Sequence, residues 1–197
     1  MNRRTFDALI AMGGVVLTVL LLAVGGLALW GHQFANDSVQ DQLVAQKIYF
    51  PEEGNEQLDD PRIGPYINEY AGEQLTTGAQ AKAYADHFIG VHLEDVADGQ
   101  TYAEVSLKSV SDPDNAELAA QAESLFKGEA LRSALLSAYA FWQVGQIALY
   151  AAISAFVGAG VMLVLAGLGF LHLRRTSPSA EVLPKVAHPN APKPATA

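Results

Sequence analysis

The sequence predicts an all-α membrane protein in which two transmembrane helices flank an extracytoplasmic helical domain. The first observation is that no Asp, Glu, Lys or Arg occurs from Ser133 to Leu173. The second is a similar uncharged apolar run from Ala8 to Trp30. About 20 apolar residues in a helix cross the ~30 Å hydrocarbon core of a bilayer, so each run is long enough to span it. Helical periodicity between the two runs is the third observation.

The chain divides into five predicted segments, each with its own composition. They are a cytoplasmic N-terminus (1–7), a first transmembrane helix (8–30), an acidic extracytoplasmic helical domain (31–145), a second transmembrane helix (146–171) and a cytoplasmic tail (172–197). The tail is rich in Pro and Ala and cannot bury a core, so we expect it to be disordered.

The distribution of charge predicts the orientation. The segment between Gly31 and Gln146 contains six Lys and Arg residues and 19 Asp and Glu residues. Outside the spans, Arg3 and Arg4 precede the first run, and Arg174 and Arg175 follow the second. Lys and Arg close to span ends stay in the cytoplasm, so both termini are expected there, in a multi-pass protein of the cell (inner) membrane. The acidic loop argues against nucleic acid as a partner.

The first apolar run is expected to remain as an anchor. A cleaved signal peptide has an apolar core of about 7–15 residues followed by a site resembling A-x-A. The run from Ala8 to Trp30 is longer and no such site follows it.

Within the loop, the pattern predicts a series of helices. The first helix continues from Gln33 to Phe50, where Pro51 stops it. The segments that follow are a loop (51–65), a short helix (66–75), a longer helix (79–97) and a segment after residue 101 that could be a short helix or a strand (105–110).

Short polar motifs predict where these helices begin and end. Thr76-Thr77-Gly78 offers an N-cap for the helix 79–97, and Asp98-Gly99 closes it. Thr101 with Glu104 forms a capping box. Asp112-Pro113 predicts the start of a helix that runs to Leu173, with a kink near Gly128 or Gly145.

His87 and His92 are candidates for a functional site. On a helical wheel His92 shares the apolar arc of Tyr84 and Phe88, whereas His87 lies on the opposite side. The five-residue spacing places the two imidazoles about 140° apart, so one helix face cannot bring both to one ion. We therefore predict a polar pair of His92 with Asp95 in the core. The alternative, a metal or proton-linked site, would need ligands from another segment.

Two further features suggest contacts between helices. Glu129 and Arg132 are three residues apart and predict an intrahelical ion pair, with docking of a partner as the alternative.

The small residues Ala151, Ala155 and Ala159, with Ser154 and Gly158 alongside, form rows of the small-xxx-small type. The sequence predicts that a helix packs on this face, either the first span or a span of a partner or a second copy. The bulkier Ile153, Phe156, Val157 and Leu163 are expected to face lipid.

Several segments resemble a family of actinobacterial membrane proteins with the same two-span layout. They are Gln42–Ile48, Leu75–Ile89, Gly99–Ala103, Leu125–Arg132 and Tyr139–Trp142. The resemblance implies a membrane location. Some members of that family are described as aromatic ring-opening dioxygenases, but a non-haem iron site needs a cluster of His and carboxylate ligands. The misaligned His87 and His92 do not predict one.

The sequence contains no Cys and no recognisable catalytic, cofactor-binding or metal-binding motif. The leading expectation is therefore a non-enzymatic accessory or scaffold subunit of a larger inner-membrane complex, which binds through its transmembrane and outer helices. The alternative is an extracytoplasmic ligand- or ion-sensing module. Because only 24 residues follow Leu173, such a sensor would signal through a separate partner.

Overall fold

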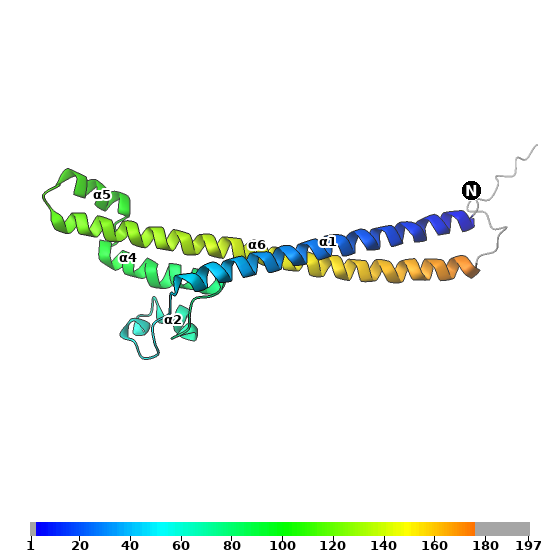
Figure 1. The fold of residues 1–197 in the computed structure, drawn as a ribbon, viewed down its shortest axis with the longest axis horizontal. Coiled ribbons are helices and arrows are strands. Elements are labelled where there is room, and N and C mark those ends of the chain that lie inside the picture. The colour runs from blue at the N-terminus through cyan, green and yellow to red at the C-terminus, as the bar shows by residue number, and fades with distance from the viewer. Residues whose placement is uncertain (1–2, 176–197) are drawn as a thin grey trace, which may run out of the picture. The chain divides into compact units, whose positions relative to one another are not determined.

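The computed structural model describes residues 3–175, and these form helices joined by short loops (Figure 1). No strand occurs among them, and the one isolated β-bridge joins Tyr49 to Gln74. In order, the elements are α1 (Arg3–Gln46), η1 (Glu56–Asp59), α2 (Gly64–Ile67), η2 (Asn68–Tyr70), α3 (Gly78–Ala83), η3 (Tyr84–Ile89), α4 (Gly90–Ala97), α5 (Tyr102–Ser111) and α6 (Ala116–Arg175). The prediction of an all-α chain is confirmed.

Two of these helices, α1 and α6, are long and apolar enough to cross a membrane by length and composition. Only 22% of each apolar window is buried. A core helix of a globular domain would bury most of such a window, so the exposed apolar surface here is unusual for a helix in water. Helix α6 continues to Arg175, two residues beyond the predicted helix end at Leu173, and the rest of the predicted tail lies outside the described residues.

The chain separates into two compact units, and α1 and α6 contribute to both. We call the described residues 3–27 and 151–175 the helix pair, and residues 28–150 the helical domain.

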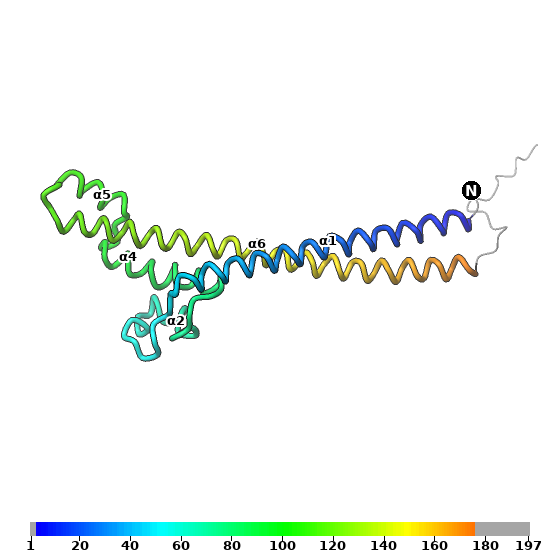
Figure 2. The backbone as a smooth tube through the Cα atoms, viewed as in Figure 1, coloured from blue at the N-terminus to red at the C-terminus, as the bar shows by residue number. Residues whose placement is uncertain are grey.

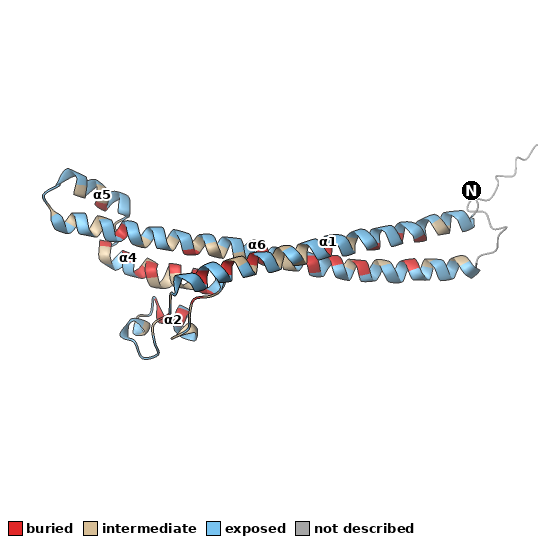
Figure 3. Cartoon of the chain, viewed as in Figure 1, coloured by how far each residue is buried: buried red, intermediate tan, exposed pale blue. Residues whose placement is uncertain are grey.

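In the helix pair the two helices run side by side in opposite directions (Figures 1 and 2). A Cβ atom added at Gly14 would lie 3.2 Å from Cβ of Ala166, and one added at Gly169 would lie 3.3 Å from Cβ of Ala11. The buried positions recur at intervals of three, four or seven residues (red in Figure 3): Ala11, Gly14, Thr18 and Gly25 on α1, and Ala152, Ala155, Ala159 and Ala166 on α6. This spacing is that of a coiled-coil seam, and its small residues let the two backbones approach closely.

The helical domain has one apolar core to which all its longer helices contribute. The largest fully buried side chains are Leu43, Ile67, Leu75, Val105, Leu125 and Leu135. Helix α4 lies along α6, where Leu93 occupies the space that a Cβ at Gly128 would need, and Gln121 donates to the carbonyl oxygen of Val96 at 2.7 Å.

The predicted caps at three helix ends are confirmed. The Thr77 hydroxyl accepts from the backbone N–H of Gln80 in a complete capping box. Thr101 and Glu104 form a second box, which opens α5 as a helix rather than a strand. Asp98 adopts the left-handed conformation that ends α4, at φ 49°.

The predicted start of the long helix at Asp112-Pro113 is wrong. Asp112 is instead the C-cap of α5, and its N–H donates to the carbonyl oxygen of Lys108 at 3.0 Å. Asn115 begins α6, because its Oδ1 accepts from the N–H of Leu118 at 3.1 Å. Asp112 and Asn115 are both of residue types that cap helix N-termini, and they lie three residues apart. The sequence pattern alone therefore does not show which of them starts α6.

No break interrupts α6 at either glycine where a kink was expected. The side chain of Leu93 packs against Gly128, and a Cβ atom at Gly145 would come within 2.9 Å of Cβ of Ala35. These glycines therefore allow close packing of neighbouring helices.

Candidate functional site

The predicted core position of His92 is wrong, because a π-helical turn precedes it. Residues Tyr84–Ile89 form the π segment η3 between α3 and α4. A π turn holds one more residue than an α turn, so every later side chain is rotated relative to a regular helix. Ala81 before the π segment and Ala85 within it are buried, whereas His92 after it is exposed.

Asp95 does not form the expected hydrogen bond with His92 and instead binds Arg62. The Arg62 guanidinium donates to both Asp95 oxygens at 2.8 and 3.0 Å, and to Oδ2 of Asp60 at 2.8 Å. This bridge, the Arg62 clamp, ties the loop before α2 to α4. Hydrogen bonds from Arg62 lower the pKa values of both Asp60 and Asp95. The two carboxylates in turn raise the pKa of Arg62.

His87, predicted on the face opposite the core, stacks on the ring of Tyr66. The ring centroids are 3.6 Å apart and the planes differ by 4°. His87 lies in η3 and Tyr66 in α2, so the stack joins two elements of the helical domain.

The Glu129–Arg132 pair is present, but Arg132 makes closer contacts with another helix. Its Nη1 lies 3.7 Å from Glu129, whereas Nη2 donates to Oδ1 of Asp86 at 3.3 Å. Its Nε donates to the carbonyl oxygen of Ala85 at 3.2 Å. Burial raises the pKa of Asp86, but ion pairs with Lys82 and Arg132 outweigh burial and leave that pKa below its usual value.

Arg132 therefore links α6 to the π segment. Asp86 is 46 residues away along the chain, so no local sequence pattern indicates this contact. The carbonyl oxygen of Ala85 also accepts a hydrogen bond from the N–H of Gly90, five residues later, which is the bond that defines a π turn. An arginine that donates to this carbonyl stabilises the unusual turn.

Only part of the predicted partner-packing face of α6 contacts α1 within the helix pair. Ala155 and Ala159 are buried, and Gly158 lies against Leu21. Ala151 and Ser154 are exposed, and Ala152 is buried in their place.

One bulky residue that was expected to face lipid contributes to the same interface. A Cβ atom added at Gly25 would lie 2.9 Å from Cε1 of Phe156. The missing side chain at Gly25 therefore leaves room for the Phe156 ring.

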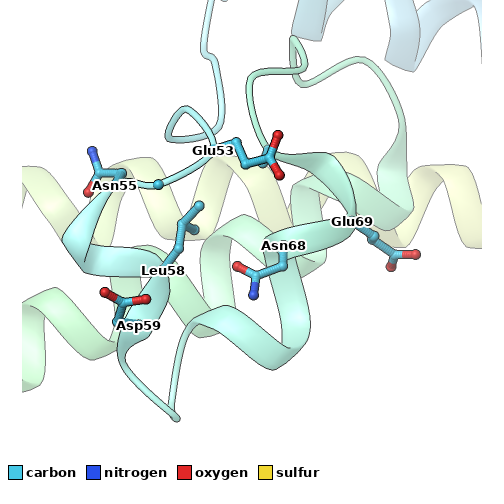
Figure 4. A pocket seen from close by; sticks show the side chains of 8 residues that line it. Glu53, Asn55, Leu58, Asp59, Asn68 and Glu69 are labelled. Carbon is cyan, nitrogen blue, oxygen red and sulfur yellow. The ribbon is translucent and has the colours of Figure 1, made fainter.

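An acidic hollow of about 370 Å³ lies in the segment before α3 (Figure 4). It is lined by Glu53, Asn55, Asp59, Asn68 and Glu69, together with Gly54, Leu58 and Ala71. In Figure 4 the carboxylates of Asp59 and Glu69 lie on opposite sides of the hollow and point apart. No group of three or more potential metal ligands converges among residues 3–175.

Helix α5 exposes large apolar side chains in the acidic helical domain. Leu107 and Val110 are 70% and 76% exposed. Tyr102 and Phe126 are also exposed, and their rings are 5.7 Å apart. On a helical wheel Leu107 and Val110 lie opposite the buried Val105. Leu107 and Val110 are three residues apart and share one face of α5. We call these two residues the α5 patch; their exposure follows from the helical wheel, although no sequence motif indicated it.

The candidate residues therefore fall into two groups with different structural roles. The charged pairs at Arg62 and Arg132 connect elements of the helical domain, whereas the α5 patch and the bulky side chains of the helix pair present apolar surface outward. No protein-family model, curated protein or solved structure matches this chain.

Proposed function

We propose that this chain is a two-span membrane protein that serves as a non-enzymatic accessory or scaffold subunit of a larger inner-membrane complex. In this proposal both termini lie in the cytoplasm and the helical domain lies outside. The resemblance to actinobacterial two-span proteins supports a membrane location, and the placement of arginines outside both spans supports this orientation.

The helix pair supports the membrane assignment through the division of its side chains. The buried positions of the helix pair are small residues such as Ala11, Ala155 and Ala159, and bulky residues such as Leu9, Leu20, Val161 and Leu168 are more than half exposed. Water would penalise such a surface, whereas lipid tails are as apolar as leucine and solvate it at no cost.

The α5 patch is the observation that carries the scaffold assignment. Monomeric soluble domains seldom expose contiguous large apolar side chains, and those that do commonly use them as interaction sites. In the helical domain acidic residues outnumber basic ones by 19 to six. We therefore propose that a partner with an apolar contact surface and a basic rim covers Leu107 and Val110.

Site-specific photo-crosslinking in native membranes tests this function. A photoreactive residue at Leu107 or Val110 should give one discrete crosslinked product, whereas the same residue at Val44, an exposed apolar position on α1, should not. The double variant Leu107→Lys with Val110→Lys should no longer retain the crosslinked protein in a mild-detergent purification. Because both positions are exposed, these changes are expected to alter stability by no more than about 0.5 kcal/mol.

A different outcome would contradict the scaffold assignment. If Leu107 and Val110 yield no product, or yield the same products as Val44, the α5 patch is not a docking surface. If the double variant melts at a lower temperature than the Val44→Lys control, the patch stabilises the fold and does not recruit a partner.

A further inference from the structure

A groove lies between α1 and α6 in the helical domain. Its volume is about 320 Å³, and it is lined by residues of α1 between Val39 and Gln46 and by residues of α6 between Ala134 and Phe141. Leu43, one of the lining residues of α1, is buried, whereas Ala134 and Phe141 are exposed. We call this feature the α1–α6 groove.

Along the α6 side of the groove, small and apolar residues recur at alternating intervals of four and three. They are Ala130, Ala134, Ser137, Phe141 and Val144, and each of them is exposed. This alternation places all five on one line along the helix, as in the seam by which helices pair in a coiled coil. No helix of residues 3–175 packs over them. We call these five residues the α6 seam.

The polar groups beside the seam suit a partner of the same kind. The Ser137 hydroxyl donates to the carbonyl oxygen of Ser133 at 2.8 Å, so its hydrogen is already used within α6. Gln42 and Gln46 line the groove from α1 and are exposed. A side-chain amide both donates and accepts hydrogen bonds, so two such surfaces match each other.

No charged residue lines the groove, although the domain around it is strongly acidic. The helical domain contains 19 acidic and six basic residues. Two copies of such a domain repel each other through their net charge, so an uncharged surface favours contact between them. The groove is such a surface, and a second copy of the chain supplies a matching one.

Lipid does not explain why the α6 seam is exposed. Ser137 precedes Gln146, where the second span is predicted to begin, by nine residues. Nine residues of helix rise about 14 Å, whereas the headgroup layer extends only about 5–8 Å beyond the hydrocarbon core. In the proposed membrane placement Ala134 and Ser137 therefore lie in water, where an exposed seam that includes Phe141 is unfavourable.

We propose that a second copy of this chain covers the α6 seam, with α6 of each copy lying in the α1–α6 groove of the other. Copies inserted into a membrane in one orientation are related by an axis along the membrane normal, so their α6 helices run parallel. A two-fold axis between these helices brings Ser137 of one copy next to Ser137 of the other. The direction of the axis rests on the proposed membrane placement. The seam does not include Leu107 or Val110, so the proposed function and the dimer use different residues.

Cysteine crosslinking of the full-length chain in native membranes tests the dimer. The chain has no native Cys, so Ser137→Cys supplies one thiol per chain. A disulfide between two copies requires their Cα atoms to lie about 4.4–6.8 Å apart. Copper phenanthroline is the oxidant. Gln143→Cys is the control, because Gln143 is exposed but lies about 160° around the helix from Phe141.

Ser137→Cys should give a disulfide-linked product of twice the chain mass of 21.0 kDa, and Gln143→Cys should remain monomeric. When chains with two different affinity tags are produced together, the product should carry both tags. A product of another mass would show that a different protein occupies the groove and would overturn the proposal. Absence of a product from both Ser137→Cys and Phe141→Cys, or an equal yield from Gln143→Cys, would also overturn it.

A charge placed in the seam provides a second test that misfolding cannot imitate. In the Ser137→Cys chain, Ala134→Glu or Ala134→Lys should lower the yield of dimer by about tenfold or more, because two like charges meet at the axis. Production of the two chains together should restore the dimer, since opposite charges then meet. An undiminished yield from either chain alone, or no recovery in the mixture, would overturn the two-fold contact.

Alkaline extraction of membranes distinguishes failure of this inference from failure of the proposed function. If alkaline carbonate removes the wild-type chain from membranes, the proposed membrane placement is wrong, and so is the axis that rests on it. If the chain resists extraction and Ser137→Cys does not crosslink, the placement is retained and only the dimer is wrong.

Discussion

Nδ1 of His32 lies 2.9 Å from the carbonyl oxygen of Gly145, so a side chain of α1 contacts the backbone of α6 within the helical domain. A carbonyl oxygen only accepts hydrogen bonds, and the contact therefore assigns the proton to Nδ1. The absence of a side chain at Gly145 allows this contact, since a Cβ atom there would lie 2.9 Å from Cβ of Ala35.

The His32–Gly145 contact predicts unequal effects for two variants. His32→Ala should reduce the free energy of unfolding by about 0.5–1.5 kcal/mol, as expected for one hydrogen bond. Gly145→Ala should cost more, about 1–3 kcal/mol, because the added methyl group forces the helices apart. Thermal unfolding in detergent measures both. Gly160→Ala, which meets no atom within 4 Å, is the control, and a Gly145→Ala protein as stable as that control would contradict the packing.

The Gly25–Phe156 contact predicts that neighbouring glycines respond differently to the same change. Gly25→Ala places a Cβ atom 2.9 Å from the Phe156 ring, whereas Gly26→Ala meets no atom within 4 Å. We expect Gly25→Ala to lower the thermal midpoint in detergent and Gly26→Ala to leave it unchanged or higher, since Ala favours a helix over Gly by about 1 kcal/mol. Equal midpoints would show that the two helices do not pack at this register.

The contacts of Arg132 predict that Asp86 is its stronger partner. A double-mutant cycle of Arg132→Gln with Asp86→Asn should give a coupling of about 1 kcal/mol, and the cycle with Glu129→Gln should give less than half of that. The reason is that Asp86 is less exposed than Glu129 and lies closer to the guanidinium. Denaturant unfolding measures both cycles, and a larger coupling to Glu129 would contradict the structure.

The same ion pairs predict a pH dependence. The pKa of Asp86 is lower in the folded chain than its ordinary value of 3.8. A carboxyl group with a lowered pKa stabilises the fold above its unfolded pKa, and this contribution is lost as the pH falls through the folded value. The stability difference between wild type and Asp86→Asn should therefore be constant above about pH 5 and shrink below about pH 4. A difference that grows on acidification would contradict the assignment.

The Arg62 clamp predicts linked titrations of two carboxyl groups. In the wild type both Asp60 and Asp95 should titrate below 3.8. Arg62→Gln removes the hydrogen bonds that lower both pKa values, so both should move up toward that value. Carbon-detected NMR titration of the side-chain carboxyls follows each group, with Glu123, paired to Lys127, as an internal control that should not move.

The features that the sequence predicted well depend on neighbouring residues. The capping boxes at Thr77 and Thr101 use a side chain and a backbone N–H three residues apart, so the pattern contains the whole interaction. The two long apolar helices likewise follow from composition over consecutive residues.

The features that the sequence could not predict depend on contacts between distant segments. The π turn at Tyr84–Ile89 changes which later residues face the core, and Arg132, more than 40 residues away, donates to its carbonyl oxygen. A regular helical wheel therefore placed His92 on the wrong face. The sequence predicts that small residues of α6 form a packing face. Within the helix pair, however, α1 packs on Ala152 rather than Ala151, because the partner helix determines which residues make the contact.

Cysteine labelling measures the topology on which the proposed function depends. The chain contains no native Cys, so Ser111→Cys and Ser177→Cys each provide one labelling site. A membrane-impermeant maleimide added to intact cells should label the cysteine at position 111, at the end of α5. The cysteine at position 177 should react only after the membrane is permeabilised. Labelling of position 177 from outside, with position 111 protected, would contradict the proposed orientation and with it the account of the helix pair as two membrane spans.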